Sequence, residues 1–397
     1  MLPAASMGRG SAGTLARADH RPRRSVRPGP LRLAGAPPAT APEPGALSLG
    51  RWPDSVCDGR SRTYRGAMTS PLIRFAAILV VVATLTSVAA ASDAFAVFKS
   101  SDRGRSWTRS DHGIPQGSRI HAFGSAGELR FVGTDSGIFT SRDKALSWQP
   151  ATGAVTSSGR VISFASLGRK VFGGTDGDGM LVSADGGRSW ALDAAFPGRK
   201  VRCLLAHDGK VYVGTDAEGV LASHDAGRTW TRLAAGLPVH GQVFALSAVE
   251  GRLFAGLYSR GLYAWDRQGS AWAKVPPVTP LALASVEGTL IAGHNPGGLS
   301  WSADLGVSWF KGVVGANAVG PSTVVASGDS GELSAEAPVW ALAANDGMVF
   351  AGASAGIYHS EDRGRTWERA RTGLPEESPG IAFLVERGFV LAGTWVK

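Results

Sequence analysis

Short apolar segments alternate with tight polar turns along most of the chain, and residues 201–230 show the pattern clearly. An apolar strand at 201–208 ends at the turn Asp208-Gly209, and a second strand follows at 210–215. A third strand at 219–223 leads into a polar turn, and a fourth begins at Trp230. Asp-Gly pairs favour hairpin turns because glycine accepts a positive φ. The pattern predicts four short antiparallel strands, which we name A to D.

The polar turn between strands C and D has a recurring form, Ser-x-Asp-x-Gly-x-Ser/Thr-Trp, which we call the Asp box. The Asp carboxylate can accept backbone N–H groups inside the turn, and the Gly takes a conformation closed to most residues. One copy has Ala145 in place of the Gly, and the copy near Trp272 is shifted and degenerate. These are folding roles, so we expect a structural function for the box aspartates: Asp102, Asp143, Asp185, Asp225, Asp304 and Asp362.

The spacing of the boxes predicts the architecture. The seven tryptophans recur every 37 to 42 residues, with one spacing of 58. A period near 40 with four strands per unit is typical of a β-propeller. Strands at 381–385 and 389–394 match A and B, whereas 95–100 and the first box match C and D. The sequence therefore predicts an all-β, seven-bladed propeller of four-stranded antiparallel blades, in which N- and C-terminal strands close the ring and leave no free edge.

The composition changes near residue 68. Residues 1–67 hold 11 arginines against four acidic residues, which accounts for most of the net charge of +9. With little apolar periodicity this segment cannot bury a core, so we expect a disordered basic tail. An over-extended reading of the gene that begins before Met68 is the alternative. Because the excess charge lies in the tail and not on a folded surface, no nucleic-acid partner is expected.

Residues 68–91 have the features of a signal peptide. Arg74 precedes an apolar run at 75–88, and Ala89-Ala90-Ala91 supplies a cleavage site. An uncleaved membrane anchor is the alternative. We therefore expect an exported propeller at 92–397, periplasmic or extracellular and monomeric, with peripheral membrane association left open. Cys203 would be its only cysteine, which excludes an internal disulfide and suggests an inert core thiol.

At the Asp boxes the sequence resembles the BNR/Asp-box propeller superfamily. That group includes sialidases, the luminal domain of sortilin, xyloglucan-degrading enzymes and photosystem II assembly-factor-like exported proteins. The unit Val-Gly-Thr-x-x-x-Gly-Val/Ile-x-x-Ser-x-Asp-x-Gly-Arg-Thr-Trp looks most like the last, largely non-enzymatic group. The resemblance implies a binding or assembly scaffold that recognises a protein or glycan partner. The alternative is a carbohydrate-active hydrolase, sialidase-like or of another glycosidase type.

Signals for catalysis are weak. Sialidases use a Phe/Tyr-Arg-Ile-Pro motif, and the nearest match, 112–115, lacks the arginine. The histidines form no His-x-x-x-His pair or Cys/His cluster, and the Asp-Gly-Asp-Gly run at 176–179 lacks the rest of a calcium loop. We therefore assign no catalytic residue and expect neither a metal nor a cofactor.

One face of the propeller is the expected binding surface. The B–C turns and D–A connections share a face opposite the boxes, and the long connection at 311–336 emerges there. Aligning the blades places a basic residue at the head of strand A beside an acidic B–C turn in three consecutive blades. These pairs are either structural struts or part of a polar binding sector that faces aromatic residues. The candidate binding residues are Arg119, Asp135, Arg160, Asp176, Lys200, Asp216, Tyr258, Arg260, His294 and Trp395.

Overall fold

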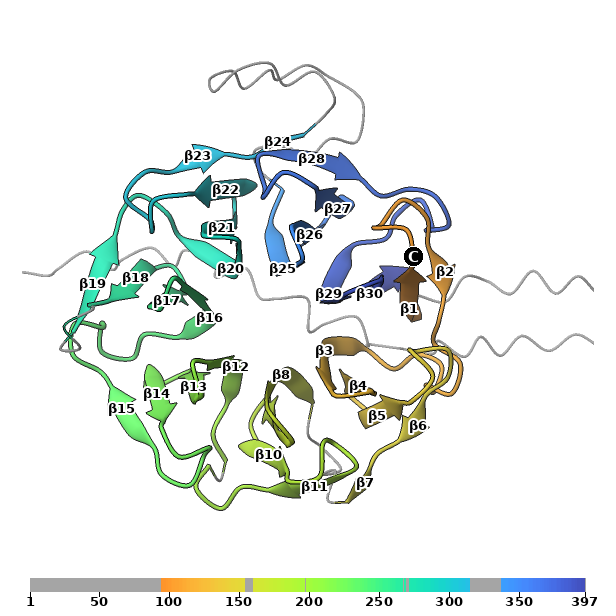
Figure 1. The fold of residues 1–397 in the computed structure, drawn as a ribbon, viewed down its shortest axis with the longest axis horizontal. Helices are drawn as coiled ribbons and strands as arrows, with labels where there is room; N and C mark the ends of the chain where they lie inside the picture. The colour runs from red at the N-terminus through yellow and green to blue at the C-terminus, as the bar shows by residue number, and fades with distance from the viewer. Residues whose placement is uncertain are drawn as a thin grey trace, which may run out of the picture. The chain divides into compact units, whose positions relative to one another are not determined.

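The computed structural model describes residues 94–153, 160–196, 198–266, 268, 271–314 and 337–396. These residues form seven antiparallel four-stranded sheets arranged as a ring of blades, two of which gain a short parallel fifth strand (Figure 1). The predicted seven-bladed propeller is confirmed. The predicted tail at 1–67, the signal segment at 68–91 and most of the 311–336 connection lie outside the described residues. Within the described part, no helix is long and apolar enough to span a bilayer.

Each blade runs outward from the axis in the order A, B, C, D, and successive A strands contact one another around the centre (Figure 1). The A strands of blades 1 to 7 are β3 (Ile120–Ala126), β8 (Val161–Leu167), β12 (Val201–His207), β16 (Val243–Val249), β20 (Pro280–Val286), β25 (Val339–Asn345) and β29 (Gly380–Glu386). The B strands are β4 (Leu129–Thr134), β9 (Lys170–Thr175), β13 (Lys210–Thr215), β17 (Arg252–Leu257), β21 (Thr289–His294), β26 (Met348–Ala353) and β30 (Phe389–Val396).

The outer strands are shorter. The C strands are β5 (Gly137–Ser141), β10 (Met180–Ser183), β14 (Val220–Ser223), β18 (Gly261–Trp265), β22 (Leu299–Ser302), β27 (Gly356–Ser360) and β1 (Ala94–Ser100). The D strands are β6 (Gln149–Pro150), β11 (Ser189–Leu192), β15 (Thr231–Leu233), β19 (Trp272–Val275), β23 (Phe310–Lys311), β28 (Thr366–Arg369) and β2 (Thr108–Arg109). Two additional strands, β7 (Thr152–Gly153) and β24 (Val313–Val314), pair in parallel with β11 and β28 of the next blade.

The ring closes as the sequence predicts. Blade 7 has the strand order β2-β1-β30-β29, so its inner half comes from the end of the chain and its outer half from near the start. Strands β1 and β30 pair along their whole length, from Ala94 opposite Val396 to Ser100 opposite Val390. Phe389 and Leu391 of β30 are buried in a cluster with Trp148 of blade 1. The closing blade is therefore joined to its neighbour by core packing as well as by the sheet.

Every regular Asp box has one hydrogen-bond pattern. The Ser hydroxyl accepts the N–H of the box Gly, or of Ala145, at 2.6–2.8 Å and donates to the Asp at 2.7–2.8 Å. The Asp in turn accepts the backbone N–H four residues later at 2.8–3.0 Å. These bonds hold the pKa of Asp102 at about 2, the Ser106 hydroxyl having the largest effect. A carboxylate whose acceptor sites are so occupied is a structural group.

The box Trp packs across the junction between blades. Trp190 of blade 2 meets Phe131 of blade 1 edge to face, with ring centroids 5.7 Å apart. Trp230 meets Phe172 in the same way at 6.3 Å. A Cβ on the adjacent box residue Gly187 would lie 2.1 Å from the Phe131 ring. Gly187 is therefore required by the close approach of the preceding blade, as well as by its positive φ of 89°.

The D–A connections are fastened to the next blade by a second junction, which we call the seam. The N–H of Trp272 donates to the carbonyl of Ala235 at 2.8 Å. A Cβ on Gly236 would lie 2.1 Å from the carbonyl oxygen of the same Trp. The segment at 112–115, the nearest match to the sialidase motif, forms such a seam with Trp148. The seam glycines with this contact are Gly113, Gly153, Gly236 and Gly373.

Candidate functional site

The face that carries the B–C turns and D–A connections, here called the mouth face, has one irregularity in every blade. At the head of each A strand the ladder to strand B skips one residue, which is the signature of a β-bulge. A bulge redirects the side chain of the skipped residue. The seven bulged residues are His121, Ile162, Arg202, Phe244, Leu281, Trp340 and Ile381.

These seven side chains differ in chemistry although the backbone around them repeats. The residue after the bulge is small in all seven blades: Ala122, Ser163, Cys203, Ala245, Ala282, Ala341 and Ala382. At the bulge itself, blades 4 to 7 carry Phe, Leu, Trp and Ile, whereas blades 1 and 3 carry His and Arg. All are half-buried except Leu281, which is buried. The heads of the A strands on the mouth face, here called the entrance, therefore have an apolar arc over blades 4 to 7 and, apart from Ile162 of blade 2, a polar arc over blades 1 to 3.

A preordered stack of side chains joins the two arcs. The Arg202 guanidinium lies over the Phe244 ring at 4.2 Å and pairs with Asp216. Phe244 stacks on Tyr258, with ring centroids 5.0 Å apart and planes inclined by 25°. Tyr258 was a candidate binding residue, but the bulge that brings Arg202 and Phe244 beside it was not anticipated. The sequence did contain a signal for this position, because it varies among repeats that are otherwise similar.

The predicted base–acid pairs are partly rearranged. Asp176 forms an ion pair with Arg160 at 3.6 Å, as expected within blade 2, and a second one with Lys200 of blade 3. Lys200 thus bridges two blades instead of pairing with Asp216. In blade 1, Asp135 accepts the backbone N–H of Arg119 at 2.9 Å, and the Arg119 guanidinium lies 5.7 Å from the Phe95 ring. Adjacent strand heads are close enough that a side chain reaches the next blade.

The remaining candidates lie in different environments. Arg260 is exposed in the B–C turn of blade 4, next to the half-buried Tyr258. His294, predicted to share a ligand with them, is 6% exposed, and its Nε2 lies 3.0 Å from the Ser300 hydroxyl. Trp395 is half-buried at the end of β30, opposite Phe95 in the ladder. The buried His294 is therefore placed to support the B–C turn of its blade, whereas the Arg260 side chain is exposed to solvent.

His121 is the most strongly perturbed titratable group at the entrance. Burial has the largest effect and lowers its pKa to about 4; the positive charge of Arg160 acts in the same direction, whereas the negative charge of Asp135 opposes the shift. Its Nε2 is buried and has no hydrogen-bond partner among the described residues. The folded protein therefore holds this imidazole neutral.

We expect the burial of His121 to make the folded protein less stable at acidic pH. Because the folded pKa lies below the unfolded value of about 6.5, the unfolded chain takes up a proton first, and stability falls as the pH drops from about 6.5 towards 4. We expect His121→Gln to remove on the order of 2–3 kcal/mol of the stability lost between pH 7 and pH 4.5. Urea denaturation at both pH values measures this, with exposed His112→Gln as the control. Equal pH dependence in the two variants would contradict the assignment.

Among the described residues, no group of three or more His, Cys, Asp or Glu side chains is arranged to hold a metal ion. The three acidic residues of the polar arc, Asp135, Asp176 and Asp216, each contact a cation or a backbone N–H. A glycosidase instead needs two carboxyl groups that face one glycosidic bond.

Comparison with known proteins gives the fold and not a family. No protein-family model matches the chain, and no curated protein sequence matches it. The solved structure of YCF48 bound to D1 peptide is 20% identical with a TM-score of 0.52, over 72% of this chain and 94% of YCF48. A GH74 enzyme from Niastella koreensis is 14% identical with a TM-score of 0.50, over 70% of this chain and 51% of the enzyme. Both similarities show a shared β-propeller fold.

Proposed function

We propose that this chain is an exported, non-enzymatic Asp-box propeller of the assembly-factor-like type, and that it recognises a segment of a partner polypeptide at the entrance on the mouth face. The observation that carries the proposal is the ring of bulged residues. Its members vary in chemistry where the supporting backbone repeats, and specific recognition requires such variation. Export is inferred from residues 68–91 of the sequence.

The chemistry of the entrance favours a polypeptide over other ligands. Trp, Tyr and Arg are enriched among the residues that contribute most to protein–protein binding. Trp340 and Arg202 are of these types, and both are half-buried, as is the aromatic Phe244. The stack of Arg202 on Phe244 and Tyr258 orders these side chains before a partner arrives, which reduces the entropy cost of binding. The D1 peptide bound to YCF48 supports the same use of this fold.

The entrance is tested by affinity capture from the exported fraction of the native cell. We expect Phe244→Ser with Tyr258→Ala to reduce recovery of partner polypeptides at least about tenfold, since anchor residues contribute about 2 kcal/mol or more each. Leu146→Ser with Val307→Ser is the matched control, because these side chains are exposed on the opposite, Asp-box face. Equal recovery with wild type and with the Phe244/Tyr258 variant would refute the proposal.

A hydrolase is the second candidate, supported by the GH74 neighbour. It is tested by incubating the purified protein with xyloglucan and with a sialoside. Turnover that survives the Phe244/Tyr258 variant would favour the hydrolase and locate its site elsewhere.

A further inference from the structure

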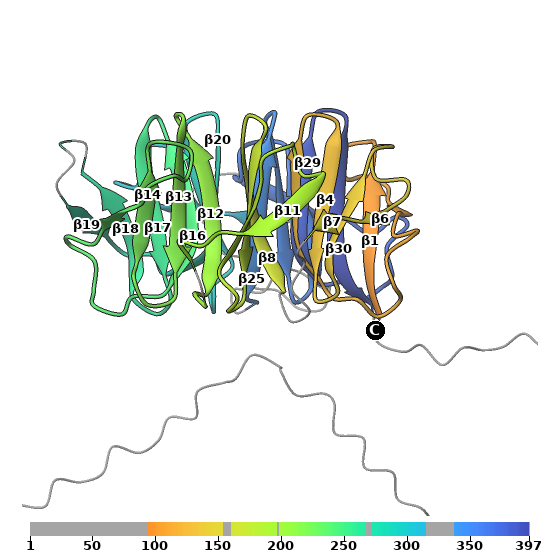
Figure 2. The same cartoon turned by 90° about the horizontal axis from the view of Figure 1, so that it is seen from below.

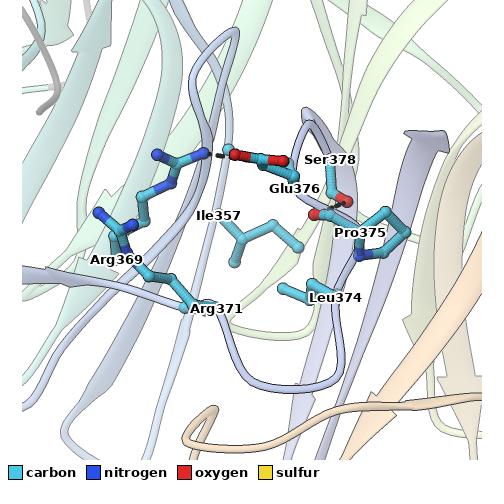
Figure 3. Close-up of a pocket in the computed structure, with 9 residues that line it drawn as sticks. Ile357, Arg369, Arg371, Leu374, Pro375, Glu376 and Ser378 are labelled. Carbon is cyan, nitrogen blue, oxygen red and sulfur yellow. Dashed lines mark hydrogen bonds between the residues drawn. The ribbon is translucent and has the colours of Figure 1, made fainter. Parts of the chain in front are cut away.

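A separate pocket opens on the mouth face at the junction of blades 6 and 7. Its volume is about 140 Å³, and its walls come from the start of β27, the end of β28 and the connection to β29. Figure 3 shows the Ile357 and Leu374 side chains directed towards its centre, with Arg369 and Glu376 at the edge. A cavity of this size holds a group of about six carbon atoms. None of its lining residues belongs to the ring of bulges.

Comparison with blade 3 shows which side chain would fill the pocket. The box Trp and the seam Gly are six residues apart in both blades, Trp230 to Gly236 and Trp367 to Gly373, so the segments align without a gap. Leu233 of blade 3 packs against Val220 and Leu237 in a hydrophobic cluster. The corresponding residue in blade 6 is Ala370, and its backbone N–H bonds to Ile357 as the blade geometry requires. Three carbon atoms that fill this space in blade 3 are thus missing from blade 6.

The next position adds a cation to the space. Where blade 3 has Ala234, blade 6 has Arg371, which lines the pocket together with Arg369. Gly356 leaves room for the Arg369 guanidinium at the edge of the pocket, because a Cβ there would sit 3.1 Å from Arg369 Nε. Two arginines and one acidic residue, Glu376, line the pocket. A small residue and an additional arginine therefore coincide in blade 6. Blades 1 and 5 also have a small residue at this position, Ala151 and Gly312, but Thr152 and Val313 follow it there.

The walls are fixed by bonds that exist without a ligand. Arg369 donates to the carbonyl of Glu376 at 3.1 Å, and the Ser378 hydroxyl donates to the carbonyl of Pro375 at 2.8 Å. The seam bond from Trp107 N–H to the Thr372 carbonyl, 3.0 Å, ties the same connection to blade 7. A site built in this way binds without first ordering a loop.

We propose that this pocket binds a small aliphatic group that carries a carboxylate. The aliphatic part occupies the space of the missing leucine, over Ile357 and Leu374, and the carboxylate pairs with the arginines at the edge. This chemistry has two sources, a free branched carboxylic acid and an aliphatic–acidic pair of residues within a polypeptide. The site does not depend on the entrance residues, so the two proposals can fail independently.

Methyl NMR of the full-length protein tests the site directly, with the Ile357 and Leu374 methyl groups as reporters. The probes are isovalerate, acetyl-Leu-Asp-amide and the neutral isoamyl alcohol. We expect one or both acids to shift the two methyl resonances saturably at millimolar concentration, as befits ligands of this size, and the alcohol to bind at least about tenfold more weakly. Saturation by the peptide alone identifies a polypeptide source, and saturation by isovalerate a free acid.

Two variants complete the test. Ala370→Leu introduces the residue of the sister blade and should abolish the shifts without lowering the melting temperature. Arg371→Ala should reduce the affinity of the acids to that of the alcohol. This variant still tests the proposal if the leucine of Ala370→Leu does not fit into the pocket. Exposed Arg105→Ala on the Asp-box face is the control. Absence of shifts with both acids up to about 20 mM, equal binding of the alcohol, or unchanged binding by both variants would overturn the proposal.

Discussion

Deleting residues 380–397 should leave a protein that does not fold to a soluble monomer. The deletion removes β29 and β30, so β1 and β2 lose their sheet and the A-strand edge of the ring is exposed. Burial of Phe389, Val390 and Leu391 also disappears, and each such side chain contributes about 1.5–3 kcal/mol. Those losses alone approach the whole stability of an ordinary domain, about 5–15 kcal/mol.

Soluble expression, size-exclusion chromatography and thermal unfolding measure this outcome. The control is deletion of residues 1–67, a far larger change that the sequence predicts to leave the propeller intact. A truncated chain that stays monomeric and melts with the control would show that β29 and β30 are dispensable. In that case the joint closure of the ring by both ends of the chain would not stabilise it.

Gly236→Ala should be among the most damaging single substitutions in the protein. The new Cβ would lie 2.1 Å from the Trp272 carbonyl oxygen, so the seam between blades 3 and 4 must open. That adds a lost backbone hydrogen bond and disturbed packing to the strain of a positive φ. We expect a loss on the order of 4 kcal/mol, which only such backbone and packing mechanisms produce.

Gly117→Ala is a closely matched control for this substitution. Gly117 has the same φ of 83° as Gly236, but a Cβ there would meet nothing within 4 Å. Its cost should therefore be the backbone strain alone, about 1–2 kcal/mol. Comparing the free energies of unfolding of the two variants in urea separates the backbone strain of the positive φ from the loss of the seam contact. Equal losses would mean that the seam contact relaxes without cost and that φ alone requires the glycine.

The repeating features could be predicted because they are local or periodic. The B strand at 210–215 and the Asp208-Gly209 turn follow from apolar pattern and turn chemistry, and both are present, with φ of 49° and 69° in the turn. The closure of the ring by both chain ends was predicted by counting which strands of a blade each end supplies. The box bonds likewise lie within a few residues of one another in the sequence.

The contacts between blades could not be predicted in the same way. A bulge shifts the strand register by one residue without changing the apolar pattern, so the proximity of Arg202 to Phe244 is invisible in the sequence. Lys200 was assigned a partner within its own blade, but the twist of adjacent sheets brings it to Asp176. The pocket at Ala370 was encoded as a difference between repeats. It became interpretable only once Ile357 and the seam fixed what surrounds that position.

The pairing of Ala94 with Val396 has a consequence for how the protein is presented to its surroundings. Strand β30 ends, and strand β1 begins, on the mouth face, at the position where the other blades have their B–C turns; the two strands lie side by side in Figure 2. Any segment that precedes Ala94 therefore leaves the propeller from the side that we assign to recognition. A fusion partner joined at either of these strand ends would compete with partner polypeptides for the proposed entrance, so the position of an affinity tag decides what the capture experiment can recover.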